Sequence, residues 1–233
     1  MIVCPVCRHS NDDFAITCTS CSSYIQDRVP NVDLFSMIWL MIESPSQAFK
    51  KVIVAEHKNF VLFLSLFLGV GALFTLMWVS KSGNSFDNLF LLLLFGTFIG
   101  LLCAIPLFFL LSGVIYSGAI IAKGTASFKE TYGIVGWSLV PVMLSVVFVL
   151  PLELSSVGLV FFSENPSGLE VKPVVTGVLL GLDGFFALWT ILLAARGISM
   201  AHRFRFITGF VVTVISVSAV SLLSVYIYSS FNI

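Results

Sequence analysis

The chain has 233 residues, of which 58% are hydrophobic and only 10% are charged, and its formal net charge is zero. A soluble domain carries about 25% charged residues, so this composition excludes a soluble protein and predicts an integral membrane protein. The balanced charge also argues against nucleic-acid binding, which requires a basic surface.

Four cysteines stand in two pairs at the start of the chain. Cys4 and Cys7 form C-P-V-C, and ten residues later Cys18 and Cys21 form C-T-S-C. Each C-x-x-C pair can place two thiolates on one side of a tetrahedral zinc ion. We therefore interpret residues 1–30 as a zinc-ribbon-like module with a structural zinc, since four thiolates leave no position for a water molecule. Free cysteines, or a disulfide in an exported head, are the alternative.

The position of this module sets the expected orientation. Zinc thiolates must stay reduced, so the module is expected to lie in the cytosol. The first residues carry no basic n-region and no apolar h-region, which predicts that there is no cleavable signal peptide. The first membrane span is then expected to act as its own insertion signal.

Residues 31–58 are predicted to form an interfacial amphipathic segment. The apolar run 34–42 is too short to cross about 30 Å of hydrocarbon, and Pro45 interrupts it. We expect a helix that lies on the membrane surface, followed by a short amphipathic piece. A cap packed against the membrane helices is the alternative.

The remaining residues, 59–233, contain five long apolar runs, which predict an all-α domain with five transmembrane helices. Each run has the length of one crossing, at about 20 residues per span. The second run is longer, so it is expected to tilt, to bend at Pro106, or to split near Gly96 and Gly100 into a hairpin. The five runs are residues 60–79, 88–121, 132–152, 174–195 and 206–228.

The basic residues favour one crossing per run. With the N-terminus in the cytosol and five crossings, ten of the twelve basic residues fall on the inner side, as the positive-inside rule requires. A hairpin in the second run would place segment 196–205 outside. We predict a C-terminus on the opposite side of the membrane. The inner residues are Arg8, Arg28, Lys50, Lys51, Lys58, Lys123, Lys129, Arg196, Arg203 and Arg205, and the outer ones are Lys81 and Lys172.

Asp183 is the one acidic residue deep in a predicted span. A charge at the centre of a bilayer costs about 2.5–3.5 kcal/mol on insertion scales, so a functional interpretation is a proton or ion site that faces the helix bundle. The alternative is an acid near a span end, or one that is hydrogen-bonded to a Ser or Thr neighbour. The outer segment 153–173, which begins with Glu153, is expected to be an irregular surface connection.

Residues 131–142 read T-Y-G-I-V-G-W-S-L-V-P-V. The small residues Gly136 and Ser138 allow close contact between helices, and Pro141 leaves a backbone carbonyl without its donor. Trp137 is expected near a span end, as are the other tryptophans, because indole prefers the interface. His202 is expected in the inner loop that follows the fourth span.

At these residues the chain resembles the Yip (Ypt-interacting protein) family of membrane proteins. Gly136, Trp137, Ser138 and Pro141 are similar to the family's G-aromatic-S-L-x-P pattern, with Trp137 in place of the Tyr often found there. S-P-S-Q-A-F at residues 44–49 resembles the segment before the family's first span, and the resemblance covers about residues 40–228. A cysteine-rich head on this domain looks more bacterial than eukaryotic, which implies a bacterial inner membrane.

The resemblance implies a non-enzymatic protein that organises membrane or recruits a cytosolic partner through its zinc head. The sequence agrees, since it holds no H-E-x-x-H, G-x-S-x-G or Walker pattern. The expected partners are the lipid bilayer and a cytosolic protein, without nucleic acid, and homo-oligomerisation is left open. The alternative function is a small-solute or ion permease that uses Asp183 and the Pro- and Gly-broken spans.

Overall fold

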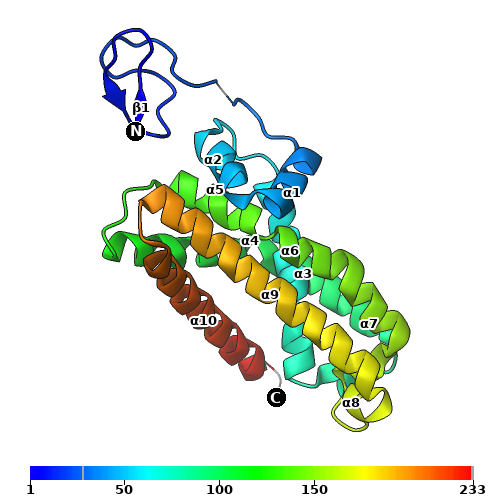
Figure 1. Ribbon diagram of the computed structural model, residues 1–233. Coiled ribbons are helices and arrows are strands. Elements are labelled where there is room, and N and C mark those ends of the chain that lie inside the picture. The colour runs from blue at the N-terminus through cyan, green and yellow to red at the C-terminus, as the bar shows by residue number, and fades with distance from the viewer. Residues whose placement is uncertain (28, 232–233) are drawn as a thin grey trace. The chain divides into compact units, whose positions relative to one another are not determined.

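The computed structural model describes residues 1–27 and 29–231 of the chain. Arg28, which is predicted on the inner side, and residues 232–233 of the predicted membrane domain lie outside the described residues. The chain divides into two compact units, Met1–Phe60 and Val61–Ile233, which are described separately. Figure 1 follows the chain from its blue N-terminus to its red C-terminus.

The first unit begins with two small hairpins. Strands β1 (Ile2–Val3) and β2 (Ser10–Asn11) pair antiparallel around the first C-x-x-C loop. A single bridge between Thr17 and Tyr24 brackets the second loop in the same way. Strands this short cannot enclose an apolar core, so the fold of this head depends on what the two loops hold between them.

Two helices follow in the first unit, α1 (Leu34–Glu43) and α2 (Pro45–Val54). Asp33 caps α1 by accepting the Ser36 N–H at 2.9 Å, and this hydrogen bond holds the pKa of the exposed carboxyl below its ordinary value. The helices meet at Ser44, because Pro45 favours the first turn of a new helix and restricts the residue before it. The segment therefore has the two pieces expected from sequence, and its place on a membrane surface stays a prediction.

The second unit confirms the prediction of five candidate spans among the described residues. Each span has a mean hydropathy between 2.0 and 2.6. Two of them extend beyond the predicted runs: the third span begins at Phe128, after a capping box formed by Ser127 and Glu130, and the fourth continues to His202. The spans are α3 (Val61–Val79), α4 (Leu89–Ile121), the composite Phe128–Ser156, α9 (Pro173–His202) and α10 (Phe206–Phe231).

Helix α4 is one continuous helix of 33 residues with Pro106 inside it, and it is not a hairpin. At 1.5 Å per residue it measures about 50 Å, which exceeds about 30 Å of hydrocarbon and requires tilt or protrusion. Cys103 on this helix is exposed rather than buried, unlike the usual position of a lone cysteine in a core.

The third span is built from four short pieces in series, three of which carry labels in Figure 1. Pro141 and Pro151 each lack the N–H that would donate to the carbonyl one turn earlier, and each lies in the first turn of a new helical piece, where that N–H is not needed. A wider π turn starts at Ser145 to accommodate the second proline. The pieces are α5 (Phe128–Ser138), α6 (Val140–Leu144), η2 (Ser145–Val149) and α7 (Leu150–Ser156).

The connection between the third and fourth spans differs from the expected irregular loop. Glu153 lies within α7 and is buried. The chain then forms two short helical turns, η3 (Gly158–Phe162) and α8 (Gly168–Val171), and Phe161 and Phe162 of η3 pack into the apolar core. Aromatic side chains thus hold this connection against the helix bundle. The short turn η1 (Ser82–Ser85) connects α3 to α4.

Close backbone contact joins the helices of the second unit. A Cβ atom on Gly69 of α3 would lie 2.2 Å from the carbonyl oxygen of Gly100 on α4, so both residues must stay small. Helices α9 and α10 also lie side by side (Figure 1), and a Cβ on Gly209 would meet the Ser199 hydroxyl at 2.0 Å. These contacts enclose a core of Val70, Leu73, Phe74, Met77, Leu92, Phe161 and Phe162.

Candidate metal centre and intramembrane cavity

The four head cysteines converge on one point. Their Sγ atoms all lie within 4.8 Å of one another, with Cys4 and Cys21 at 3.6 Å and Cys7 and Cys18 at 3.5 Å. A tetrahedral ion with zinc–sulfur bonds of about 2.3 Å separates its sulfurs by about 3.8 Å. The thiols therefore fit one four-coordinate metal ion, whereas the sulfurs of a disulfide lie about 2.05 Å apart.

The two C-x-x-C loops share one backbone arrangement. In each loop the N–H of the first cysteine donates to the carbonyl five residues later, and its carbonyl accepts from the N–H four residues later, at 2.8–3.0 Å. The residue after the second cysteine is left-handed in both loops, with φ 57° at Arg8 and 58° at Ser22. Glycine adopts this conformation most easily, so two other residues hold it here because the loop requires it.

Hydrogen bonds distinguish the thiols. The Ser23 hydroxyl lies 3.2 Å from Cys4 Sγ and 2.9 Å from Cys21 Sγ. It is the largest influence that lowers the pKa of Cys4 to about 6. At Cys7 a backbone hydrogen bond from His9 acts in the same direction, but burial and the neighbouring sulfurs raise the pKa of this thiol to about 11. Donors around Cys4 thus favour the thiolate form that binds metal.

Ser23 and Asn11 were not predicted from the sequence as part of this site. The buried Asn11 side chain donates to Cys18 Sγ at 3.5 Å and accepts the Thr19 N–H at 2.9 Å, so it ties one loop to the other. Such outer contacts orient metal ligands. The only signal in the sequence is a polar residue close to each cysteine pair, which is too common to identify them.

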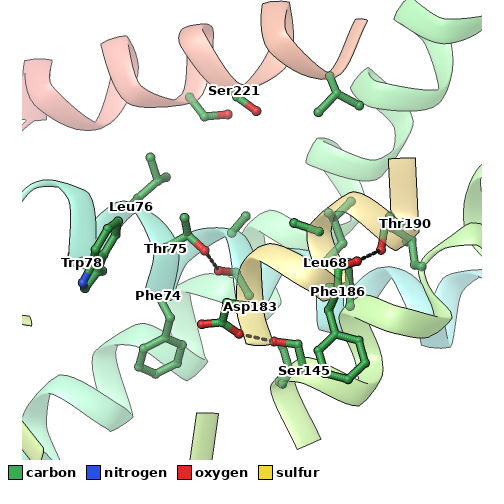
Figure 2. Close-up of a pocket in the computed structure, with 18 of the residues that line it drawn as sticks. Leu68, Phe74, Thr75, Leu76, Trp78, Ser145, Asp183, Phe186, Thr190 and Ser221 are labelled. Carbon is green, nitrogen blue, oxygen red and sulfur yellow. Dashed lines mark hydrogen bonds between the residues drawn. The ribbon is translucent and has the colours of Figure 1, made fainter. Parts of the chain in front are cut away.

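The second unit contains a cavity of about 700 Å³ that all five spans line. Its wall is largely apolar and aromatic, and Asp183 of α9 reaches it (Figure 2). The Ser145 hydroxyl, at the start of the π turn, donates to Asp183 Oδ1 at 2.6 Å. Such a bond is compatible with both interpretations of Asp183, and a proton or ion role for it stays a prediction.

Glu153 also lines this cavity, which the sequence did not predict. Its residue surface is only 3% exposed, and among the described residues its Oε1 atom has no hydrogen-bond partner. Its carboxyl lies close enough to that of Asp183 for the two to interact. The predicted third run ended at residue 152, just before the charged Glu153, whereas α7 continues the helix to Ser156.

The family-like motif serves helix contact. A Cβ atom on Gly136 would lie 2.3 Å from Val61 Cγ1, so this glycine lets α5 approach the start of α3. Trp137 is 0% exposed, so its indole packs among other helices rather than facing outward, and its place near the interface stays a prediction. Pro141 is buried too, and the Ser138 hydroxyl donates to a carbonyl one turn earlier at 2.7 Å. Tight packing of the small residues draws the indole into the bundle.

His202 is the last residue of α9 and is buried, rather than lying in the inner loop. Its Nε2 atom lies 2.9 Å from Thr131 Oγ1 on α5, and its ring stacks on Phe204 at 5.6 Å between centroids. Arg203, with φ 59°, ends the helix just beyond it. His202 therefore joins the ends of two spans instead of facing a lipid headgroup.

A family model described as the Yip1 domain matches residues 39–228, well over half of the chain. The chain belongs to the Yip1 domain family. This confirms the resemblance drawn from Gly136, Trp137, Ser138 and Pro141. The Yip1 family is one of membrane proteins that are not known as enzymes. Comparison with curated proteins and with solved structures gives no significant match.

The metal centre and the cavity lie on different sides of the boundary of the Yip1 domain match, which begins at residue 39. Asp183 and Glu153 lie inside the Yip1 domain, whereas the four cysteines all precede residue 39. The cavity is therefore formed by the Yip1 domain, and the metal centre belongs to a module placed before it.

Proposed function

We propose that this Yip1 protein is a non-enzymatic membrane protein that recruits a cytosolic partner through a zinc-bound head. The convergence of four thiols, outside the residues that the family model matches, is the observation that carries the proposal. A four-thiolate zinc site has no open position for a substrate, so the zinc stabilises the head and leaves its surface to act.

The surface of the head supports a binding role. Val6 is 71% exposed and Tyr24 is 63% exposed, on a module of only about thirty residues. Tyrosine and neighbouring apolar side chains are typical of the centres of protein interfaces. Because the backbone bridge at Tyr24 does not require an aromatic side chain, this residue can be changed without disturbing the metal ligands.

A crosslinking pull-down with the full-length protein as bait tests this recruitment. We expect one defined partner in the presence of zinc and loss of that partner after chelation. Tyr24→Ser with Val6→Ser should lose the partner as well while the zinc content is unchanged, because these side chains are exposed and bind no metal. Capture that survives both chelation and the double substitution would exclude the head as the recruiting element.

We also propose that the head is cytosolic and that the C-terminus lies across the membrane. The observed span limits support this orientation, since Lys123 lies between the second and third spans and Lys172 lies just before the fourth. Helix α1 exposes Phe35, Trp39 and Ile42 on successive turns, which suits a helix on the inner membrane surface.

Reporter fusions to the two ends test this orientation. We expect a green fluorescent protein at the N-terminus to be fluorescent, because it folds in the cytosol, and alkaline phosphatase at the C-terminus to be active, because it folds outside. The reciprocal fusions should be inactive and serve as controls. Activity of both ends in one compartment would rule out an odd number of crossings.

A small-solute or ion permease is the second candidate function, favoured by a cavity to which all five spans contribute. Asp183→Asn should then abolish transport, while Cys4→Ser with Cys7→Ser should leave it intact. Under the recruitment function, Asp183→Asn should leave partner capture intact, while Cys4→Ser with Cys7→Ser should abolish it.

A further inference from the structure

Most of the hydroxyls that line the Yip1 cavity donate their hydrogen bond within the protein, which leaves them as acceptors toward the cavity. Figure 2 shows the hydroxyls of Thr75 and Thr190 bonded to carbonyls of their own helices, and Ser145 bonded to Asp183. No Lys, Arg or His is present among the described residues that line the cavity. Hydroxyls that donate within the protein are those of Thr75, Ser138, Ser145, Thr190 and Ser224.

Two carboxyl groups reach this cavity. Asp183 receives one hydrogen bond, from Ser145, while the buried Oε1 of Glu153 receives none from the described residues. Carboxylates in an apolar environment require a neutralising partner. The protein supplies no cation among the described residues that line the cavity, so a cationic group on a ligand would satisfy both carboxyls.

Aromatic rings complete the wall. Phe74 and Phe162 lie 5.8 Å apart, and Phe161 lies 5.1 Å from Phe162 and 6.5 Å from Trp78, measured between ring centroids. Aromatic faces attract cations, and they bind organic ammonium groups especially well. The ring of Trp78 already holds Lys81, whose Nζ atom is 4.6 Å from the ring centre, which leaves the phenylalanine rings for a ligand.

The size of the cavity selects between kinds of cation. A volume of about 700 Å³ is that of a site for a drug-sized organic molecule. A bare metal ion would contact only a small part of it and would lack the six or more oxygen ligands that hard cations prefer. An organic cation with a large apolar portion fits both the acidic end and the apolar wall.

We propose that Glu153 and Asp183 together bind the positively charged group of an amphipathic organic cation, whose apolar portion occupies the cavity of the Yip1 domain. This cation site does not depend on recruitment through the head. For the permease function, the second candidate above, the proposal identifies amphipathic organic cations as the substrate class. Because binding can be measured without transport, the site and the permease function can fail separately.

Equilibrium binding of radiolabelled tetraphenylphosphonium to the full-length protein in lipid nanodiscs tests this proposal. Empty nanodiscs correct for partition into lipid. We expect saturable binding of about one cation per chain. Neutral triphenylphosphine oxide, which has similar rings and no charge, should compete at least about tenfold more weakly, because it cannot neutralise the carboxyls.

Glu153→Gln and Asp183→Asn keep the shape of each side chain and remove its charge. We expect each to weaken cation binding about 10- to 100-fold, as for the loss of a hydrogen-bonded charge. Glu164→Gln removes an exposed carboxyl outside the cavity and should bind like the unaltered protein. Monodisperse elution and an unchanged apparent Tm of each variant establish that its Yip1 domain is folded.

Loss of binding in both folded cavity variants, with Glu164→Gln unaffected, would establish the acidic pair as the site. Three results would overturn it: no saturable binding of the cation, equal binding of the neutral competitor, or full affinity in either folded cavity variant. A cavity variant that does not fold is replaced by Ser145→Ala, which removes the donor to Asp183 and should change cation affinity while that of the neutral competitor stays the same.

Discussion

Replacement of Cys4 and Cys7 by serine is expected to abolish metal binding and to unfold the N-terminal head, while the five spans stay folded. The head has two-residue strands and cannot form an apolar core, so its free energy of folding comes from the metal. Elemental analysis by mass spectrometry should find about one zinc per chain in the unaltered protein and none in the double variant. Limited proteolysis should then cleave the head of the variant and leave the Yip1 domain intact.

Cys103→Ser is the matched control for this experiment. Cys103 lies alone on α4, outside the cluster of four, so its loss should change neither zinc content nor proteolysis. A double variant of Cys4 and Cys7 that still carries stoichiometric zinc would contradict the four-cysteine centre. Iron in place of zinc, which four thiolates also bind, would keep the centre and correct the identity of its ion.

Gly69→Ala is expected to destabilise the Yip1 domain by about 1–3 kcal/mol, a typical cost of overpacking. The added Cβ would lie 2.2 Å from a backbone oxygen of α4, and a backbone atom cannot move aside by changing rotamer. Gly100→Ala should act alike, since its Cβ would meet the backbone of Val70 at 2.8 Å. A thermal scan in detergent should show a fall in the apparent Tm of about 2–12 °C.

Gly113→Ala provides a control on the same helix as Gly100. A Cβ at Gly113 meets no atom within 4 Å, so this substitution should leave the Tm unchanged or raise it slightly through helix propensity. Equal losses of Tm at Gly100 and Gly113 would mean that α3 and α4 do not approach as closely as described. Comparing the Tm of Gly100→Ala with that of Gly113→Ala therefore distinguishes the loss of contact between α3 and α4 from any general effect of an added methyl group in α4.

The two sites suggest a division of labour within the chain. Under these proposals the head would bind a cytosolic protein through its exposed side chains, and the cavity of the Yip1 domain would bind an organic cation. Because the metal centre and the cavity lie in different units, loss of one should leave the other functional. The zinc content of the cavity variants and the cation affinity of the cysteine variants both check this independence.

Several features follow directly from the order of the amino acids. Apolar runs of about twenty residues can satisfy their backbone in lipid only as helices, so the sequence alone locates the five spans. The spacing of Cys4, Cys7, Cys18 and Cys21 predicts that four thiols converge where they could hold one ion, for a similarly local reason. The Yip1 family is recognisable from Gly136, Trp137, Ser138 and Pro141, because small residues and prolines constrain the backbone wherever they occur.

Other features depend on how distant segments pack. The π turn at Ser145 carries the third span past Pro151 and buries Glu153 beside Asp183 of α9. Trp137 was expected near a span end and His202 in the inner loop, and both side chains are buried among other helices. Local patterns specify the conformation of a segment, whereas the neighbours of a side chain depend on contacts between segments that no short stretch of sequence records.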